Sequence, residues 1–460
     1  MGQGERTGKG FSKNIGIIGS GYVGLVTGTC LAEIGHKVLC QDLDKDKVSV
    51  LKSGGLPIYE PHLKDLLKKN MEKGRLSFTS DAKETIIFSE VIFICVGTPP
   101  LKDGEADLSA VENVTRQIAE YSSSHKLIVE KSTVPVETGA WIQKTLQAYC
   151  RNSQAEFDVA SNPEFLREGK AVHDFLHPDR IVVGIENRRA GDAMKNLYSP
   201  ILNRSFACPI HADCSQSQPV PLVITDIKSA ELIKHASNSF LATKISFINA
   251  LADICERAGA DVTKVAYGMG LDSRIGEGFL NAGIGFGGFC FPKDLQAFIR
   301  IAERLGYNFS LLKEVERINK SRVEVIIDKL KKKLWILKGK LVGILGLSFK
   351  PDTDDIRFAP SLKIIKKLQK EGAIIKVYDP QAMDRTKKET SGLIFCANPL
   401  EVAKDSEALL MVTEWDEFKN LDFNKIKSLM RRPLIIDGRN MLDREKMLEM
   451  GLEYQGIGIK

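Results

Sequence analysis

The stretch NIGIIGSGYVG at residues 14–24 decides the fold of the first part of this chain. It opens with an apolar run at 14–18 that is typical of a buried strand, and a helical pattern follows it as far as Ile34. Gly35 then ends the helix, and a second apolar run ends at Asp42. Strand, glycine-rich turn, helix, strand and acidic residue in this order predict a βαβ unit that binds a dinucleotide.

The three glycines of this stretch have different predicted roles. Gly19 and Gly21 permit a tight turn and the close approach of a pyrophosphate, and Gly24 lets the helix pack on the strand. The helix N-terminus that follows favours the phosphate charge. Asp42 is placed to bind ribose hydroxyls and to repel a 2′-phosphate, so the predicted cofactor is NAD and not NADP. A purely structural glycine turn is the alternative, and Asp42 argues against it.

Further α/β alternation follows this unit. Residues 91–96, 127–130 and 157–160 are predicted strands, and short polar segments follow each of them. Open α/β sheets bind ligands at the carboxyl ends of their strands. Three hydroxyl side chains at these ends are therefore site candidates, although serine and threonine are also common in ordinary loops. They are Thr98, Ser132 and Thr133.

Residues 223–258 contain neither glycine nor proline, which predicts one long helix that ends at Gly259. Lys234 and Asn238 are four residues apart and therefore project from the same face. A lone lysine–asparagine pair on a helix usually does not indicate a functional site. Here apolar residues at the same period, beginning at Ile227, place the pair in a predicted buried stripe, where a lysine needs a charge partner.

The segment GIGFGGFCFPKD at residues 283–294 places Cys290 between a glycine-rich approach and a predicted helix over 292–305. Pro292 suits the first turn of a helix. A thiol just ahead of a helix N-terminus is stabilised as a thiolate, and Lys293 adds a nearby cation. Asp294 lies within reach to hold or deprotonate a water. We interpret Cys290 as a nucleophile; the alternative is a buried structural cysteine.

A second nucleotide-type half begins near Lys340. An apolar strand at 341–345 leads into a Gly-Leu-Ser turn, a helix is predicted at 362–368, and the strand at 374–378 ends at Asp379. Two more predicted strands follow, at 408–412 and 434–437. The predicted fold class is therefore α/β, with two Rossmann-like nucleotide-binding domains joined by a central helical domain that contains one long helix.

Composition narrows the class of protein. A length of 460 residues predicts two or three domains, and a net charge of +6 argues little about partners. The lysine-rich run at 329–340 is interpreted as a solvated helix face followed by a strand, so no nucleic-acid partner is expected. The longest uncharged apolar run, 91–101, is too short to cross a bilayer, and residues 1–13 have no apolar signal core. We therefore expect a soluble, cytoplasmic protein with no membrane partner.

Cysteine usage points to the same compartment. The chain has nine cysteines, an odd number that forms neither a disulfide framework nor a paired CxxC zinc site. Reduced thiols in the cytosol fit best. The sequence therefore predicts no metal.

Nine motifs, spread from about Lys13 to Arg439, together resemble the nucleotide-sugar 6-dehydrogenases of the UDP-glucose/GDP-mannose dehydrogenase family. One departure is Phe289, where many relatives carry serine. The motifs are GSGYVG at 19–24, VGTPP at 96–100, EKSTVPV at 130–136, NPEFLREG at 162–169, HPDRIVVG at 177–184, ELIKHASNSF at 231–240, SRIGEGFLNAGIGFGGFCFPKD at 273–294, GLSFKPDTDDIR at 346–357 and DGRN at 437–440.

The resemblance implies an NAD-dependent, two-step oxidation of UDP-glucose at C6 to UDP-glucuronate, through a thiohemiacetal and a thioester on Cys290. NPEFLREG and CFPKD resemble the UDP-glucose branch, and GDP-mannose or another nucleotide sugar is the alternative substrate. Two other hypotheses remain open. One is a one-step NAD dehydrogenase of hydroxy acids that uses a lysine–asparagine pair without a cysteine, and the other is a catalytically silent nucleotide-sugar-binding protein.

The resemblance also implies roles for individual residues. The implied catalytic residues are Cys290, Lys234, Asn238, Asp294, Thr133 and Glu164. The implied cofactor-binding residues are Gly19, Gly21, Tyr22, Val23, Gly24, Asp42, Lys47, Thr98, Ser132, Thr133, Glu168, Lys293 and Arg357. The implied substrate-binding residues are Glu164, Phe165, Leu166, Lys234, Asn238, Arg274, Phe279, Leu280, Asn281, Gly287, Phe349, Lys350 and Arg439.

The family's organisation implies domain boundaries and an oligomer. The long helix is expected to form a homodimer or a higher homo-oligomer, and Arg274 to reach the neighbour's sugar-nucleotide site. The implied divisions are a disordered tail at 1–13, an NAD-binding domain at 14–215, a central helical dimerisation domain with the catalytic cysteine at 216–325, and a UDP-sugar-binding domain at 326–460.

Overall fold

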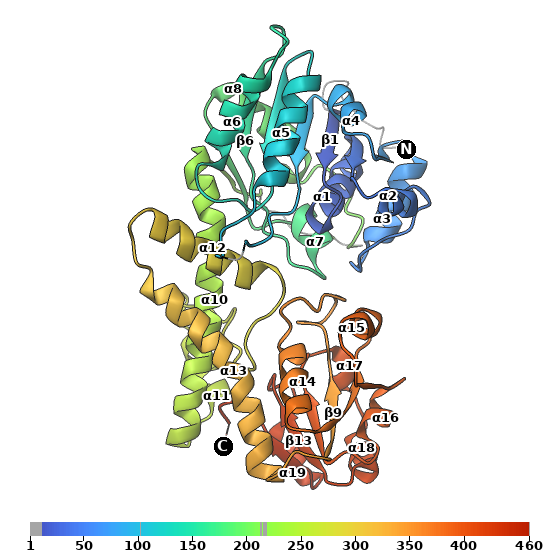
Figure 1. Ribbon diagram of the computed structural model, residues 1–460, viewed down its shortest axis with the longest axis vertical. Helices are drawn as coiled ribbons and strands as arrows, with labels where there is room; N and C mark the ends of the chain where they lie inside the picture. Colours follow the sequence, from blue (N-terminus) through green and yellow to red (C-terminus); the bar gives the residue numbers. More distant parts are fainter. Residues whose placement is uncertain (1–11, 102, 212–213, 215–218, 460) are drawn as a thin grey trace. The chain divides into compact units, whose positions relative to one another are not determined.

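The computed structural model describes residues 12–459, apart from 102, 212, 213 and 215–218. Most of the predicted tail, residues 1–11, lies outside the described residues. The chain divides into two units, residues 1–236 and 237–460, and the boundary falls within the long helix α10 (Ile227–Ala258). Figure 1 labels most of the helices and some of the strands of both units. The three domain ranges implied by the family stay a prediction.

The first unit is built on an eight-stranded sheet in the order β3-β2-β1-β4-β5-β6-β7-β8. Neighbouring strands are parallel except β6 and β7. The chain turns one way after β1 and the other way at β4, so the carboxyl ends of these two strands form a switch point, where such sheets bind ligands. The strands are β1 (Asn14–Ile18), β2 (Lys37–Gln41), β3 (Leu76–Thr79), β4 (Val91–Ile94), β5 (Lys126–Glu130), β6 (Phe157–Ser161), β7 (Ile181–Ile185) and β8 (Leu222–Thr225).

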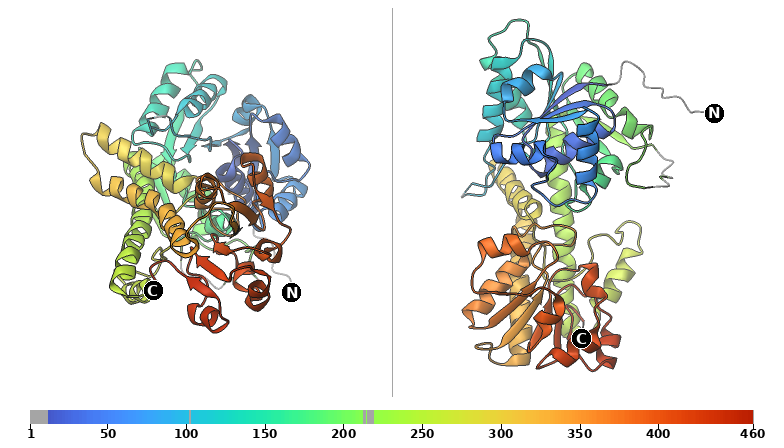
Figure 2. Two further views of the ribbon diagram at one scale, coloured as in Figure 1. Left: turned by 60° about the horizontal axis from the view of Figure 1, so that its bottom comes forward. Right: turned by 90° about the vertical axis from the view of Figure 1, so that its right-hand side faces the viewer.

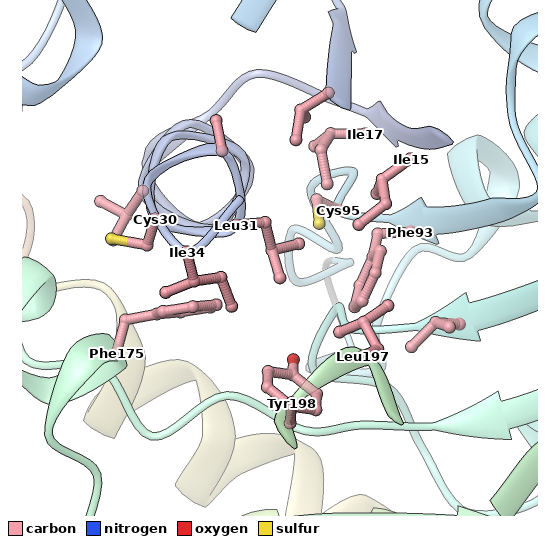
Figure 3. Close-up of a cluster of buried hydrophobic side chains, with 14 of the residues drawn as sticks. Ile15, Ile17, Cys30, Leu31, Ile34, Phe93, Cys95, Phe175, Leu197 and Tyr198 are labelled. Atoms are coloured by element: carbon pink, nitrogen blue, oxygen red, sulfur yellow. The ribbon is translucent and has the colours of Figure 1, made fainter. Parts of the chain in front are cut away.

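Helices cover both faces of this sheet. Alternate strand residues face opposite sides: Ile15 and Ile17 join one buried cluster with Leu31, whereas Ile92 and Ile94 join a second cluster. Figure 3 shows the first cluster beneath the helix that follows β1. The helices are α1 (Tyr22–Glu33), α2 (Lys45–Lys52), α3 (Leu63–Glu72), α4 (Ala82–Phe88), α5 (Ser109–Tyr121), α6 (Thr138–Tyr149), α7 (Ala171–Leu176), α8 (Arg188–Leu197) and α9 (Ser199–Leu202).

The long helix was predicted over residues 223–258, and the predicted start is wrong because the helix begins at Ile227. Residues 223–225 belong to β8, because the β-branched run Val-Ile-Thr pairs in parallel with β7. Asp226 then caps the helix by accepting a hydrogen bond from Ser229 N at 2.8 Å. The predicted end at Ala258 is confirmed, and Gly259 follows with a φ of 77°.

The second unit carries a six-stranded parallel sheet in the order β11-β10-β9-β12-β13-β14. Its strands are β9 (Leu341–Leu345), β10 (Ile374–Tyr378), β11 (Ile394–Phe395), β12 (Ala408–Met411), β13 (Leu434–Asp437) and β14 (Glu453–Gln455). Its helices after α10 are α11 (Val262–Gly270), α12 (Cys290–Arg304), α13 (Ser310–Leu334), α14 (Pro360–Lys370), α15 (Met383–Glu389), α16 (Pro399–Ala403), α17 (Asp416–Lys419), α18 (Phe423–Leu429) and α19 (Arg444–Glu449).

Helices again lie on both faces of the second sheet, as the views in Figure 2 show. Ile326 of α13 and Ile364 of α14 pack in one buried cluster with Ile344, and Phe418 and Ile426 pack in the other with Leu409. The predicted fold class is therefore confirmed: one α/β unit has a mainly parallel sheet, the other has a parallel sheet, and the segment between the two sheets in sequence is helical and includes one long helix. Within the described part of the chain, no helix combines the length and the apolar character that crossing a membrane requires.

Candidate functional site

The glycine-rich turn after β1 is shaped by steric need at two positions and by open space at the third. Gly19 has a φ of 98°, and a Cβ there would lie 2.7 Å from the Cys95 carbonyl oxygen. A Cβ on Gly24 would lie 1.9 Å from the Gly19 oxygen, so the helix packs against its own turn. A Cβ on Gly21 would meet no atom within 4 Å. Gly21 caps α1, which starts with Tyr22 and Val23, so the backbone beside this helix start is accessible to a ligand.

Asp42 lies directly after β2 and next to this turn. Its carboxylate accepts hydrogen bonds from Ser20 N at 3.0 Å and Asp44 N at 3.1 Å, and Lys47 Nζ lies at 2.8 Å. A cavity of about 280 Å³ is lined by Gly19, Gly21, Asp42 and Lys47. Four residues that were predicted to bind the cofactor therefore line one cavity at the switch point of the first sheet.

Tyr22, another predicted cofactor residue, has its hydroxyl committed elsewhere: it donates to Glu60 Oε2. Glu60 also accepts hydrogen bonds from Gly169 N and Ala171 N, both at 2.7 Å. Burial raises the pKa of the Glu60 carboxyl. Glu60 thus joins the first turn of α1 to the start of α7, beside Glu168, which is half-buried. Sequence analysis missed Glu60, because its contacts span more than a hundred residues and no motif surrounds it.

The hydroxyl candidates after β4 and β5 connect these two strand ends. Thr98 Oγ1 donates to the Thr133 carbonyl oxygen at 2.8 Å. Ser132 Oγ donates to the Val96 carbonyl oxygen, also at 2.8 Å. Thr98 and Ser132 therefore hold the two loops together, and the half-buried Thr133 lies at their junction.

Lys234 meets the charge partner that its burial requires. Its Nζ lies 2.8 Å from Glu164 Oε1 and donates to the Glu164 carbonyl oxygen at 2.7 Å, with both side chains no more than 6% exposed. The other carboxylate oxygen accepts from Leu166 N at 2.6 Å. The Phe165 ring lies beside them, its centroid 5.5 Å from the ammonium. The structure thus brings these four predicted residues together.

A second buried lysine stands near this pair and was missed by sequence analysis. Lys131 Nζ donates to the Asn162 side-chain oxygen at 3.1 Å and to its carbonyl at 3.2 Å. Tyr198 also donates to that side-chain oxygen, at 2.7 Å. Burial lowers the pKa of Lys131 to about 8. Lys131 follows β5 immediately, and its place at a strand end was the available signal.

Cys290 is the first residue of α12, so the helix begins two residues before the predicted start at Pro292. Proline is tolerated there, because the first N–H groups of a helix have no partner within it. The thiol is half-buried at the positive end of a 15-residue helix. Asp294 follows four residues later on the same face.

Asp294 connects α12 to α10 within the second unit. Asn238 Nδ2 donates to Asp294 Oδ2 at 2.6 Å, and Lys293 Nζ lies 2.6 Å from Oδ1. All three side chains are buried. Lys293, a predicted cofactor residue, is therefore ion-paired with Asp294. Its Nζ also lies 5.8 Å from the Phe289 ring centroid. Phe289 also stacks against Arg357, whose guanidinium lies 4.6 Å from the same centroid.

The glycine-rich approach to Cys290 is held by polar side chains that sequence analysis missed. Asn319 exchanges two hydrogen bonds with the Phe286 backbone, at 2.8 and 3.0 Å. Asn249 accepts from Gly283 N at 2.8 Å, and the fully buried Arg322 donates to the Gly283 carbonyl at 3.3 Å. Gly285, with a φ of 89°, leaves no room for a Cβ, which would lie 2.4 Å from Asn319 Oδ1. These contacts fix the loop that precedes the thiol.

Residues predicted to bind substrate gather around Arg439. A cavity of about 220 Å³ is lined by Leu280, Asn281 and Arg439. The Arg439 guanidinium donates to three carbonyl oxygens, among them Gly285 at 3.1 Å and Phe349 at 3.2 Å. Arg439 thus braces the glycine-rich loop against the segment after β9.

The remaining substrate candidates lie around this loop. Lys350 Nζ lies 5.6 Å from the Phe349 ring centroid. A Cβ on Gly287 would lie 2.7 Å from the Phe358 carbonyl oxygen, so this backbone is closely packed. Phe279 has a φ of 68°, and its ring lies 6.2 Å from that of Phe291.

Arg274 differs from the other candidates because it is exposed. Its side chain is 86% exposed, and its guanidinium binds Asp272 at 2.6 Å. In the described part of this chain it lines neither of the two cavities above.

Comparison with known proteins gives this arrangement a family. Residues 13–202 match the NAD binding domain of the UDP-glucose/GDP-mannose dehydrogenase family, residues 228–321 match its central domain, and residues 343–444 match its UDP binding domain. The chain belongs to this family. The resemblance stated from the motifs is confirmed, and so is the predicted NAD-binding character of the first part.

Individual relatives match almost the whole chain. It is 47% identical over 451 residues to UDP-glucose 6-dehydrogenase TuaD of Bacillus subtilis (strain 168), which covers 97% of this chain and 93% of that protein. It is 43% identical to UDP-glucose 6-dehydrogenase of Rhizobium meliloti (strain 1021), over 96% of this chain and 99% of that protein. The solved structure of a UDP-glucose dehydrogenase from Pyrobaculum islandicum superposes with a TM-score of 0.88 at 35% identity, covering both chains completely.

Proposed function

We propose that this chain is an NAD-dependent UDP-glucose 6-dehydrogenase. The reaction is UDP-glucose + 2 NAD⁺ + water giving UDP-glucuronate, two NADH and three protons. One observation of geometry carries the chemistry: Cys290 begins α12, and Asp294, one turn later, is held by Asn238 at 2.6 Å. Full-length identity to UDP-glucose 6-dehydrogenases supports the choice of sugar nucleotide.

The first unit offers a place that fits NAD. The open backbone at Gly21 and the start of α1 would receive the pyrophosphate. Asp42, at the edge of the same cavity, would accept hydrogen bonds from the adenosine ribose. Bound NAD supplies the hydride acceptor for both oxidation steps.

The residues of this chain would do the remaining chemistry. After the first oxidation, the Cys290 thiolate attacks the C6 aldehyde and forms a thiohemiacetal, which can lose a second hydride where the bare aldehyde cannot do so readily. The product is a thioester. Water, which Asp294 would hold, attacks it and releases the carboxylate and the thiol. Lys234 and Asn238 would stabilise the negative charge that develops on the C6 oxygen.

Counting NADH per sugar tests the proposal. A two-step enzyme yields two NADH for each UDP-glucose consumed, and a one-step dehydrogenase yields one. A silent binding protein yields none. UDP-glucose should be oxidised with the highest kcat/KM when it is compared with GDP-mannose and UDP-N-acetylhexosamines. Preference for GDP-mannose would overturn the choice of substrate and leave the two-step chemistry standing.

We also propose that the chain acts as a homodimer formed through α10. Phe240, Phe247 and Ile254 recur every seven residues on this helix and are 66%, 51% and 58% exposed. Such a stripe of large apolar side chains usually marks a contact. Arg274 is exposed and therefore available to a neighbouring subunit. All nine cysteines lie in the described part of the chain and none of them forms a disulfide there, which fits the reducing cytoplasm that we propose as the location.

Mixing two inactive variants tests the dimer. If Arg274 completes the neighbour's site, Arg274→Ala and Cys290→Ala proteins should recover activity when their subunits exchange, because one site in each mixed dimer is then intact. A monomeric protein in solution, or exchange without recovery, would contradict the proposal.

A further inference from the structure

Four side chains of the first unit, His177, Cys208, His211 and Cys214, form a cluster that the proposed reaction does not use. Each offers one nitrogen or sulfur atom, and these atoms all lie within 4.8 Å of one another. His177 follows α7 directly, whereas the other three belong to the run CPIHADC at residues 208–214 after α9. This run lies between the stretches 13–202 and 228–321 that match the family's domains.

The spacing of these atoms fits a tetrahedral metal site. Four ligands at zinc distances of about 2.0–2.3 Å place neighbouring ligand atoms about 3.3–3.8 Å apart. Here His177 Nε2 lies 3.2 Å from Cys208 Sγ and 3.8 Å from Cys214 Sγ. Cys208 Sγ lies 3.6 Å from His211 Nδ1. The cluster thus needs little rearrangement to surround one ion.

We propose that His177, Cys208, His211 and Cys214 bind one Zn²⁺ ion. Two sulfur and two nitrogen ligands suit zinc, which is borderline-soft and is almost always bound by four ligands in tetrahedral geometry at structural sites. Binding releases two protons from the thiols and the water bound to the ion, and it oxidises nothing. The two thiolates neutralise the ion's charge, and His211 N already donates to Cys208 Sγ at 3.3 Å.

One neighbour must adjust. Arg204 Nη1 lies 2.9 Å from His177 Nδ1. When Nε2 binds the ion, Nδ1 carries the ring proton, so the guanidinium must turn away from it. His173 packs against both ligand rings, with centroids 5.3 Å from each, and limits their rotation.

The ion would be structural. It would join the segment after α9 to the end of α7, across 31 residues of sequence between His177 and Cys208. α7 begins at Ala171, whose N–H is held by Glu60, the residue that also accepts from Tyr22 beside the glycine-rich turn. Zinc would therefore stabilise the position of α7, which Glu60 links to the glycine-rich turn after β1, and it would contact no reacting atom. This proposal stands apart from the proposed function and revises the prediction that the chain binds no metal.

Metal content of the full-length chain tests the proposal. Protein equilibrated with excess Zn²⁺ and then desalted should retain about one zinc per chain by mass spectrometry of the metal. Cys208→Ser and Cys214→Ser should each lose most of it. Cys150→Ser, a substitution of a half-buried thiol outside the cluster, should retain it. Circular dichroism checks that the variants are folded.

Cobalt gives a second, independent measurement. Co²⁺ in the site should show thiolate-to-cobalt charge-transfer bands and the intense visible bands of tetrahedral coordination, and Cys208→Ser should weaken them. A wild-type chain that retains no zinc, equal zinc in the wild type and both cysteine variants, or a Cys208–Cys214 disulfide in the protein under reducing conditions would each overturn the proposal. Because NADH production is not the readout, failure here leaves the proposed reaction untouched.

Discussion

Replacing Glu164 with alanine should destabilise the first unit by about 3–5 kcal/mol, because it leaves the Lys234 ammonium buried without its counter-charge. Lys234 is 4% exposed, and the Glu164 carboxylate lies 2.8 Å from it. The ammonium keeps its bond to the backbone carbonyl of residue 164, at 2.7 Å, which lowers the cost. Leu166 N loses its acceptor, which adds roughly 1 kcal/mol. We therefore expect about 4 kcal/mol.

Urea unfolding of the full chain, followed by circular dichroism, measures this loss. Glu112→Ala is the matched control, because Glu112 pairs with Arg116 at the surface, where both side chains are nearly half exposed. That control should cost no more than about 0.5 kcal/mol. In Glu164→Gln the amide oxygen can still accept from Lys234, so this variant should fall between the two. Equal unfolding midpoints for Glu164→Ala and Glu112→Ala would refute the view that Lys234 depends on this carboxylate.

Three further predictions test the nucleophile, the cofactor and the response to pH. Cys290→Ser should bind UDP-glucose and then either remain as a trapped adduct or give no net product by mass spectrometry, because an ester resists hydrolysis more than a thioester does. The control variant Cys150→Ser should turn over normally. Normal turnover by Cys290→Ser would exclude the covalent route. Asp42→Ala should lower kcat/KM for NAD by about 10–100-fold, the worth of hydrogen bonds to a charged group, and should raise NADP use by less; equal wild-type use of both cofactors would contradict this role. Burial raises the pKa of Glu231 to about 7, so the folded state favours the protonated carboxyl and loses stability as pH rises from about 4.5 to 7. Glu231→Gln should remove that part of the decline in thermal melts between pH 5 and 8, and an unchanged slope would show that another group causes it.

Local patterns in the sequence were sufficient for much of the fold. The strand, glycine turn and helix at residues 14–33 depend on neighbours in sequence, and the predicted βαβ unit is present. The predicted start of α10 was wrong because Val223 pairs with Val182 of β7, a strand that lies far away in sequence. Propensity alone does not show which of two allowed structures such a pairing will select.

The candidate site divides along the same line. Cys290 and Asp294 could be proposed as candidates because a helix start and a four-residue spacing are local features, and α12 does begin at Cys290. Glu60 and Arg322 could not, because they act through backbone groups that the chain brings to them from distant segments. The run CPIHADC was overlooked for another reason: a search for paired CxxC motifs does not register Cys-x₂-His-x₂-Cys with a distant histidine.

The two sheets place an acidic residue at the same topological point and use it differently. Asp42 follows β2, receives a single N–H from the glycine turn, Ser20 N at 3.0 Å, and borders a cavity. Asp379 follows β10, is fully buried, and accepts from Leu347 N at 2.7 Å and Trp415 Nε1 at 3.2 Å. Its carboxylate therefore fixes the turn after β9 through these hydrogen bonds and is not exposed to bind a ribose. α14 also begins only at Pro360, well after that turn, whereas α1 begins at Tyr22, directly after the glycine-rich turn that follows β1. The two sheets thus share a strand order but differ in the groups at this point. The first sheet is suited to a dinucleotide, and the second must recognise its nucleotide through other groups.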